Sequence, residues 1–291
     1  MALTKRCVPV MADDLLAETS ACLAVLRREL HGARLQISEE VAHAPQAIAL
    51  LSRMVYLCEG AVDLARTERK SAAAVLVRPA IECWIDCCYL LYCKWEAVLQ
   101  LTSLGLRERV KLARIWLGDA PVPDLVDQLD QLDEVVAAGH ESGVLDPEFK
   151  LVSSLSVESR LVAAIRGRGA TPTYLDVYDY LYRMISLGEI HTSSALDSHA
   201  VGDEIEFHFQ VTPVATLNVE QLIALTVRMA CGAAVDVFPL IGSDDAELDV
   251  VSGSLDARLG STLAVMQDDL AASADAITQR ALAVLHSRGQ S

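Results

Sequence analysis

The stretch SAAAVLVRPAIECWIDCCYLL, residues 71–91, decides the fold class because it is apolar on almost every side when it is read as a helix. A helix that is apolar all round is buried among other elements, so we expect this one at the centre of the molecule. Ser71 is a candidate N-cap, and the helix is expected to continue to about Leu101. Pro79 lacks a backbone donor, which predicts a kink at that position.

Three charged residues interrupt this apolar helix. Arg78, Glu82 and Asp86 follow one another at a spacing of four, which places them on one face. A buried charge is costly unless it is paired, so each of these groups needs a partner. Two interpretations remain open. The row is either a structural set of ion pairs or a site, with Arg78 and Glu82 as catalytic groups or all three as ligand-binding groups.

A second polar row occurs in TYLDVYDYLYRMISLGEIH, residues 173–191, where a helix is expected over 173–187. Hydroxyl side chains recur there at every fourth position, namely Tyr174, Tyr178, Tyr182 and Ser186. Buried tyrosines need a partner for the hydroxyl group. Tyr178, Tyr182 and Ser186 therefore either line a polar ligand pocket or form a core stripe whose hydroxyls reach solvent. His191 follows directly and is a candidate catalytic residue.

The rest of the chain predicts further helices and one strand. Apolar residues recur at helical spacing in the ranges 13–31, 45–69, 106–117, 124–136, 156–167, 217–238 and 256–287. Residues 242–254 are expected to form an acidic loop. The segment EIEFHFQV, 204–211, alternates strictly and predicts a short extended or β segment. The expected fold is all-α: one multi-helix bundle over 1–291, with a core at about 45–240 on which helices 13–31 and 256–287 pack.

Two rows of like charge are expected to be solvated helix faces. One is acidic, with a carboxylate at every third position: Asp124, Asp127, Asp130 and Asp133. The other is basic: Arg107, Arg109, Lys111 and Arg114. A spacing of three drifts around a helix, which argues against a metal cluster in the acidic row. The single Glu-x-x-His at Glu40 and His43 is too few ligands for a bundle metal site, so neither a metal nor a cofactor is expected.

Composition narrows the class of partner. The chain of 291 residues carries a formal net charge of −16, which would repel a phosphate backbone, so bulk nucleic-acid binding is not expected. The eight cysteines form no Cys-x-x-Cys pair and are interpreted as buried free thiols. We expect a cytoplasmic protein that does not bind membranes. Its partner is an unknown protein or small molecule, and a homo-oligomer is possible.

The charged helix and the hydroxyl helix together resemble a bacterial helical family of unknown function. Its members show a run of small residues, Arg-Pro or Arg-Ser, and a Glu four residues after the Arg, as at Arg78 and Glu82. A later helix carries Tyr, Ser and His, similar to Tyr182, Ser186 and His191. The likeness covers about residues 45–195, although four residues separate Ser186 from His191 where about three are expected. The resemblance implies an all-helical fold and these site residues, and it implies no reaction.

Two functions are compatible with these rows. In the first, the protein binds a partner or small ligand in a polar pocket lined by Arg78, Glu82 and the tyrosine–serine face. In the second, it is a metal-independent phosphodiester hydrolase in which His191 is the acid or base and Arg78 or Arg183 holds the anion. Small helical ribonucleases with an Arg-x(4–6)-His motif are loosely similar, but seven residues separate Arg183 from His191 here. Whether the protein is an enzyme stays open.

Overall fold

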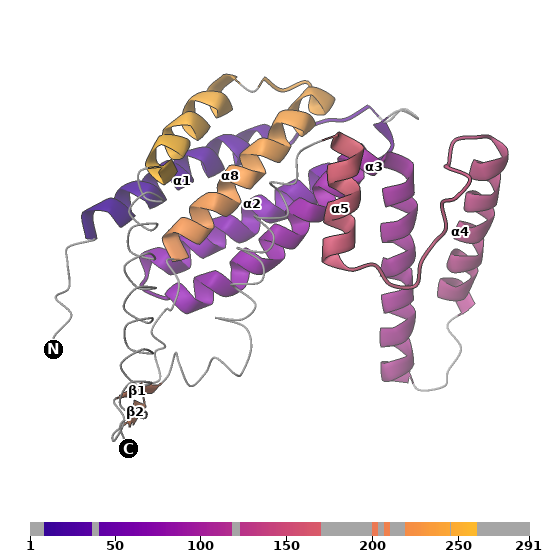
Figure 1. Ribbon diagram of the computed structural model, residues 1–291, viewed down its shortest axis with the longest axis horizontal. Coiled ribbons are helices and arrows are strands. Elements are labelled where there is room, and N and C mark those ends of the chain that lie inside the picture. Colours follow the sequence, from indigo (N-terminus) through magenta and orange to yellow (C-terminus); the bar gives the residue numbers. More distant parts are fainter. Residues whose placement is uncertain are drawn as a thin grey trace, which may run out of the picture.

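The computed structural model describes residues 9–36, 41–117, 123–169, 200–202, 207–209, 219–244 and 246–260. Most of these residues lie in helices, so the expected all-α, multi-helix fold is confirmed (Figure 1). The helices are α1 (Pro9–Leu30), α2 (Ala44–Arg66), α3 (Lys70–Leu117), α4 (Pro123–Glu141), α5 (Val157–Arg168) and α8 (Val219–Val237), and the 3-10 turn η5 (Phe238–Ile241) follows α8. Residues 246–260 are also helical.

Four elements pack side by side into a bundle: α1, α2, the first half of α3, and α8. The bundle forms because each helix presents an apolar face to the others. The helix predicted over 13–31 has one buried face, formed by Leu15, Thr19, Cys22, Leu23, Leu26 and Leu30. The helix over residues 71–91 is central as predicted, since Ile81, Ile85 and Leu90 are each 0% exposed.

The long helix α3 bends at one residue. Lys94 has φ 45° and ψ −118°, and it is the single non-helical residue inside α3. The kink at Pro79 stays a prediction. The separate helix predicted over 106–117 exists, but it begins earlier, directly after the break at Lys94, and it ends at Leu117. Ser71 is not the N-cap, since α3 already begins at Lys70. Figure 1 shows that the two halves of α3 run in different directions and that one half lies apart from the bundle.

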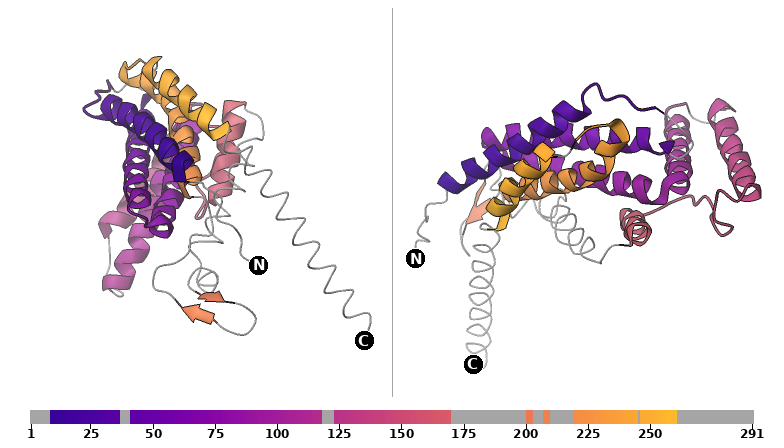
Figure 2. Two further views of the ribbon diagram at one scale, coloured as in Figure 1. Left: turned by 90° about the vertical axis from the view of Figure 1, so that its left-hand side faces the viewer. Right: turned by 90° about the horizontal axis from the view of Figure 1, so that it is seen from above.

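Beyond the bend, residues 95–117 of α3 pair with α4, and we call this pair of helices the arm. Figures 1 and 2 show the arm at one end of the molecule, apart from α1 and α8. Within α4 no side chain is buried. The aspartates of the predicted acidic row are all exposed, and the leucines opposite them are half-buried against α3. The prediction of a solvated acidic face is confirmed.

The remaining helices agree with the sequence at most boundaries. Ser156 caps α5 by accepting a hydrogen bond from the amide of Ser159 at 3.0 Å. Gly169 ends that helix at φ +66°, a left-handed conformation that glycine adopts without strain. The helix α8 ends at Val237, one residue before the predicted end at 238, and η5 follows it. Residues 246–254 are helical, so the predicted loop over 242–254 was mostly wrong. Leu248 and Leu255 explain why: both are buried against the bundle, which overrides the acidic local composition.

The extended segment is half of a short hairpin. Strand β2 (Phe207–Phe209) lies inside the predicted range 204–211, and it pairs antiparallel with β1 (Ala200–Gly202). The helix predicted over 173–187 and the part of the last helix beyond 260 lie outside the described residues. One described stretch, Val219–Ile241, is long and apolar enough to cross a membrane by length and composition. In its most apolar window 61% of the residues are buried inside the protein, which is the pattern of a core helix.

Candidate functional site

The charged row predicted on α3 divides between two ion pairs. Arg78 Nε lies 3.4 Å from Glu82 Oε1 on the same helix, and these side chains are 30% and 37% exposed. Asp86 instead meets Arg160 of α5, with 2.8 Å between Oδ1 and Nε and side chains 20% and 14% exposed. The angle of that contact does not satisfy a hydrogen bond, so it is an ion pair only. The structure thus pairs Arg78 with Glu82 and joins Asp86 to a different helix.

The environment of Asp86 shifts the pKa of its carboxyl group. Burial raises the pKa of Asp86 to about 6, the Arg160 guanidinium opposes that rise, and the charge of Glu82 adds to it. A carboxyl group with a pKa near neutrality can either accept or donate a hydrogen bond under physiological conditions. Among the charged residues predicted on α3, this one has the properties of a functional group.

Residues 170–199 lie outside the described part of the chain, and they include the whole predicted hydroxyl row. Tyr178, Tyr182, Ser186 and His191 therefore have no described position. Whether the hydroxyl row faces Arg78 and Glu82 stays a prediction.

A cavity of about 560 Å³ opens at the bend of α3. Its walls come from the start of α2, from both halves of α3 and from α4: Gln46, Ala49, Leu50, Asp86, Leu90, Leu101, Thr102, Gly105, Leu106, Arg109 and Gln128. Leu90 and Leu106 are buried at its floor, whereas Gln46, Arg109 and Gln128 are exposed at its rim. Small-molecule sites typically have volumes of about 300–1,000 Å³ and combine an apolar lining with a few polar groups.

Sequence reasoning named only two residues of this cavity, and it named them for other reasons. Asp86 belonged to the charged row and Arg109 to the basic row. The cavity exists because α3 bends at Lys94 and brings residues 86–90 and 101–109 to face the same space. No sequence pattern marks a positive φ at a lysine. The bend, and with it the cavity, could therefore not be predicted from the sequence.

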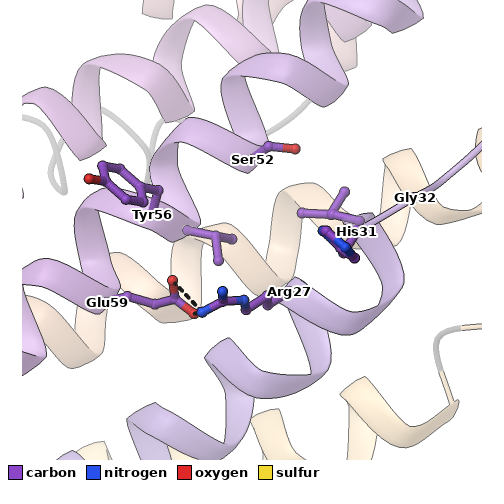
Figure 3. Close-up of a pocket in the computed structure, with 8 residues that line it drawn as sticks. Arg27, His31, Gly32, Ser52, Tyr56 and Glu59 are labelled. Atoms are coloured by element: carbon purple, nitrogen blue, oxygen red, sulfur yellow. Dashed lines mark hydrogen bonds and ion pairs between the residues drawn. The ribbon is translucent and has the colours of Figure 1, made fainter.

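A second hollow of about 260 Å³ lies between the end of α1 and the middle of α2 (Figure 3). Arg27 Nη1 donates to both carboxylate oxygens of Glu59, at 3.1 and 3.3 Å, and the pair spans the hollow. Figure 3 shows the hydroxyl groups of Ser52 and Tyr56 pointing away from this pair. Because its polar groups diverge, this hollow is a weaker candidate than the cavity at the bend.

A polar cluster that the sequence analysis missed joins three helices. The Tyr92 hydroxyl of α3 donates to Asp236 of α8. Arg168 of α5 lies 3.8 Å from the same carboxylate and 5.3 Å from the centre of the Tyr92 ring. Gly167 permits this approach, since a Cβ there would lie 2.8 Å from the Tyr92 carbonyl oxygen. The cluster holds α3, α5 and α8 together, so its first role is structural.

The cysteines behave as buried apolar groups. Seven of them lie in the described residues, all are free, and only Cys93 is not fully buried. Burial raises the pKa of Cys83 to about 11 and that of Cys88 to about 12, which keeps both thiols protonated and unreactive. Within the described ranges, no group of three or more His, Cys, Asp or Glu side chains is placed to hold a metal ion.

The fold and the cavity define the class of protein. It is an all-α protein whose central helix bends beside a cavity large enough for a small ligand. The chain belongs to DUF5677, a family of unknown function whose model matches residues 46–207. That range includes every residue that lines the cavity at the bend, whereas Arg27 and His31 of the second hollow precede it. No curated protein and no solved structure matches the chain. The resemblance to an uncharacterised family is confirmed, and the family supplies no activity.

Proposed function

We propose that this protein is a cytoplasmic binding module that takes up a small amphipathic molecule in the cavity at the bend of α3. The observation that carries the proposal is the cavity itself, with about 560 Å³ of space between α2, both halves of α3 and α4. Its volume and lining are typical of small-molecule sites. Seven free, largely buried thiols are compatible with a reducing compartment.

The lining indicates the chemistry of the ligand. Leu50, Leu90 and Leu101 offer an apolar surface to the body of the molecule. Asp86 and Arg109 then offer one acceptor and one cation to its polar end. Because the Asp86 carboxyl has a pKa of about 6, it suits a ligand that exchanges a hydrogen bond rather than one that brings a full positive charge.

The predicted hydroxyl row belongs to the same proposal. Arg78 and Glu82 precede Asp86 by two turns and one turn of α3, so a wall formed by Tyr178, Tyr182 and Ser186 beside them would extend the polar end of the site. The support for this wall is the spacing of its residues in the sequence.

Filling the cavity tests the proposal. Gly105 lines the cavity, and a Cβ at that position would meet no atom within 4 Å, so Gly105→Phe places a ring in the cavity without a clash at the backbone. Gly253 is equally open and lies on the helix over 246–260, which makes Gly253→Phe the matched control. The measurement is thermal unfolding in the presence of a panel of small aliphatic and aromatic acids, alcohols and amides.

A ligand of the native state at a hundredfold excess over its Kd adds about 2.7 kcal/mol of stability. We expect some members of the panel to raise the Tm of the parent and of Gly253→Phe but not that of Gly105→Phe. The proposal fails if no member raises the Tm of the parent, or if the active members raise the Tm of Gly105→Phe equally.

The hydrolase alternative rests on the sequence. In it, His191 is the acid or base, Arg78 or Arg183 binds the anionic group of the substrate, and Glu82 orients one of these side chains. An RNA-cleavage assay on the same purified protein tests it directly. The net charge of −16 counts against a substrate with a phosphate backbone, which is why ligand binding is the preferred proposal.

A further inference from the structure

The outer face of the arm leaves large apolar side chains in solvent. At the end of α3, Trp116 is 84% exposed, Ile115 is 69% exposed and Leu112 is 51% exposed. Spacings of three and four residues place them on one stripe of the helix. Apolar side chains gathered in this way mark an interaction surface, whereas apolar residues exposed singly are ordinary.

Charges of opposite sign flank this apolar stripe. Arg107, Lys111 and Arg114 recur at spacings of four and three on α3, and all are exposed. On α4 the acidic row of Asp124, Asp127, Asp130 and Asp133 is exposed as well. Lys111 lies 3.7 Å from Glu108, with both side chains about two-thirds exposed. In the described part of the chain, Arg114 and the four aspartates form no ion pair.

We propose that the arm is an interface with a second copy of this chain. Two arms pair antiparallel about a twofold axis, so that the end of α3 in each copy lies against α4 of the other. The partner's α4 then covers the apolar stripe around Trp116. The acidic row of each copy faces the basic stripe of the other.

Charge complementarity favours a second copy of the chain as the partner at this surface. One arm carries both a basic and an acidic surface, and a twofold axis satisfies both at once because each surface meets its complement. Tryptophan and arginine are also the residue types enriched in protein interfaces. The exposed aspartates beside the apolar stripe would repel an anionic membrane or a nucleic acid. The net charge of −16 adds to that repulsion.

The experiment measures the mass of the full chain in solution by sedimentation or light scattering over a concentration series. The basic variant carries Arg107→Glu, Lys111→Glu and Arg114→Glu, and the acidic variant carries Asp124→Lys, Asp127→Lys and Asp130→Lys. We expect the parent to form a dimer, and each variant alone to dissociate at least about tenfold more readily. An equimolar mixture of the two variants should form a heterodimer, because the reversed charges again face their complements.

A pair of aromatic variants provides the control for the apolar stripe. Trp116→Ala should weaken the dimer by about tenfold or more, as the loss of a central interface tryptophan does. Tyr56 is 74% exposed on α2, away from the arm, and Tyr56→Ala should leave the dimer unchanged. All the substituted side chains are exposed, so the circular dichroism spectrum of each variant should match that of the parent. A monomeric parent, a mixture that stays monomeric, or a dimer indifferent to Trp116→Ala would each overturn the proposal.

Discussion

The bundle and the arm are joined through α3, whose two helical segments meet at Lys94, yet the two segments bury their side chains to very different degrees. Before the bend at Lys94, residues such as Ile81, Ile85 and Leu90 are 0% exposed. Beyond it, Leu106 and Val110 are buried, while Ile115 and Trp116 stand in solvent. What surrounds a helix, more than its own composition, therefore decides how much it contributes to stability. The region with fewer buried contacts is also the region better suited to binding and adjustment.

The largest expected effect compares one leucine in each region. Leu51 of α2 is 0% exposed in the bundle, and Leu129 of α4 is half-buried in the arm. Leu51→Ala should lower the free energy of unfolding by about 3 kcal/mol, because it leaves a cavity in a packed core. Leu129→Ala should lower it by only about 1 kcal/mol, since part of the side chain is already in water.

Urea unfolding followed by circular dichroism measures both losses in the same buffer. Helix propensity is matched in the two variants, because each replaces a leucine by alanine inside a helix. Equal losses would contradict the comparison and show that the arm is as tightly packed as the bundle.

The second effect is a pH dependence that arises where the two regions meet. Burial raises the pKa of Asp86 from an ordinary 3.8 to about 6 in the folded state. The folded protein therefore binds this proton more tightly than the unfolded chain does. The stabilising contribution is fully present below about pH 4 and is lost as the pH rises through about 6. Relative to Asp86→Asn, the parent should lose about 2 kcal/mol of stability between these limits.

The measurement is the free energy of unfolding of the parent and of Asp86→Asn at intervals from acid to neutral pH. Asp130→Asn, on the exposed face of the arm, controls for the loss of one carboxylate. A difference between parent and Asp86→Asn that stays constant with pH would show that Asp86 is not buried as described.

The sequence predicted most of the fold because helical periodicity reports burial directly. The inner face of α1 and the central position of residues 71–91 both followed from the spacing of apolar side chains. The bend at Lys94 did not, because no glycine or proline marks that position. Residues 246–254 were missed for a related reason: a few buried leucines outweigh an acidic composition that is typical of a loop.

The candidate site was predictable only where a charge interrupts an apolar helix. Arg78, Glu82 and Asp86 stood out because buried charges require partners. The spacing correctly suggested the pair of Arg78 with Glu82, since both lie on one helix. It could not reveal that Arg160 of α5 meets Asp86, because that contact depends on how two helices pack. The cavity depends on the bend as well, so it was beyond the reach of periodicity.

The smallest effect compares two lysines that each pair with a glutamate. In the bundle, Lys70 Nζ lies 2.7 Å from Glu220 Oε1, and the Glu220 side chain is only 9% exposed. In the arm, Lys111 lies 3.7 Å from Glu108, and both side chains are about two-thirds exposed. Lys70→Ala leaves a nearly buried carboxylate without its cation and should cost about 1–2 kcal/mol, below the loss for a fully buried pair because Lys70 is partly solvated. In a single copy of the chain, Lys111→Ala should cost less than about 0.5 kcal/mol.

Urea unfolding at low and high salt, at a protein concentration low enough to dissociate a dimer, separates the two cases. Salt screens exposed charges far more than buried ones, so any effect of Lys111→Ala should vanish at high salt while that of Lys70→Ala persists. Suppose that Lys111→Ala lowers the free energy of unfolding as much as Lys70→Ala does, and that high salt does not reduce the effect. The pair of Lys111 and Glu108 would then lie in a low-dielectric setting. In a dimeric parent that result would have one direct cause, the burial of the basic stripe against a partner's α4. Repeating the measurement on Trp116→Ala then decides the matter, because loss of the dimer should return Lys111→Ala to a small, salt-sensitive effect.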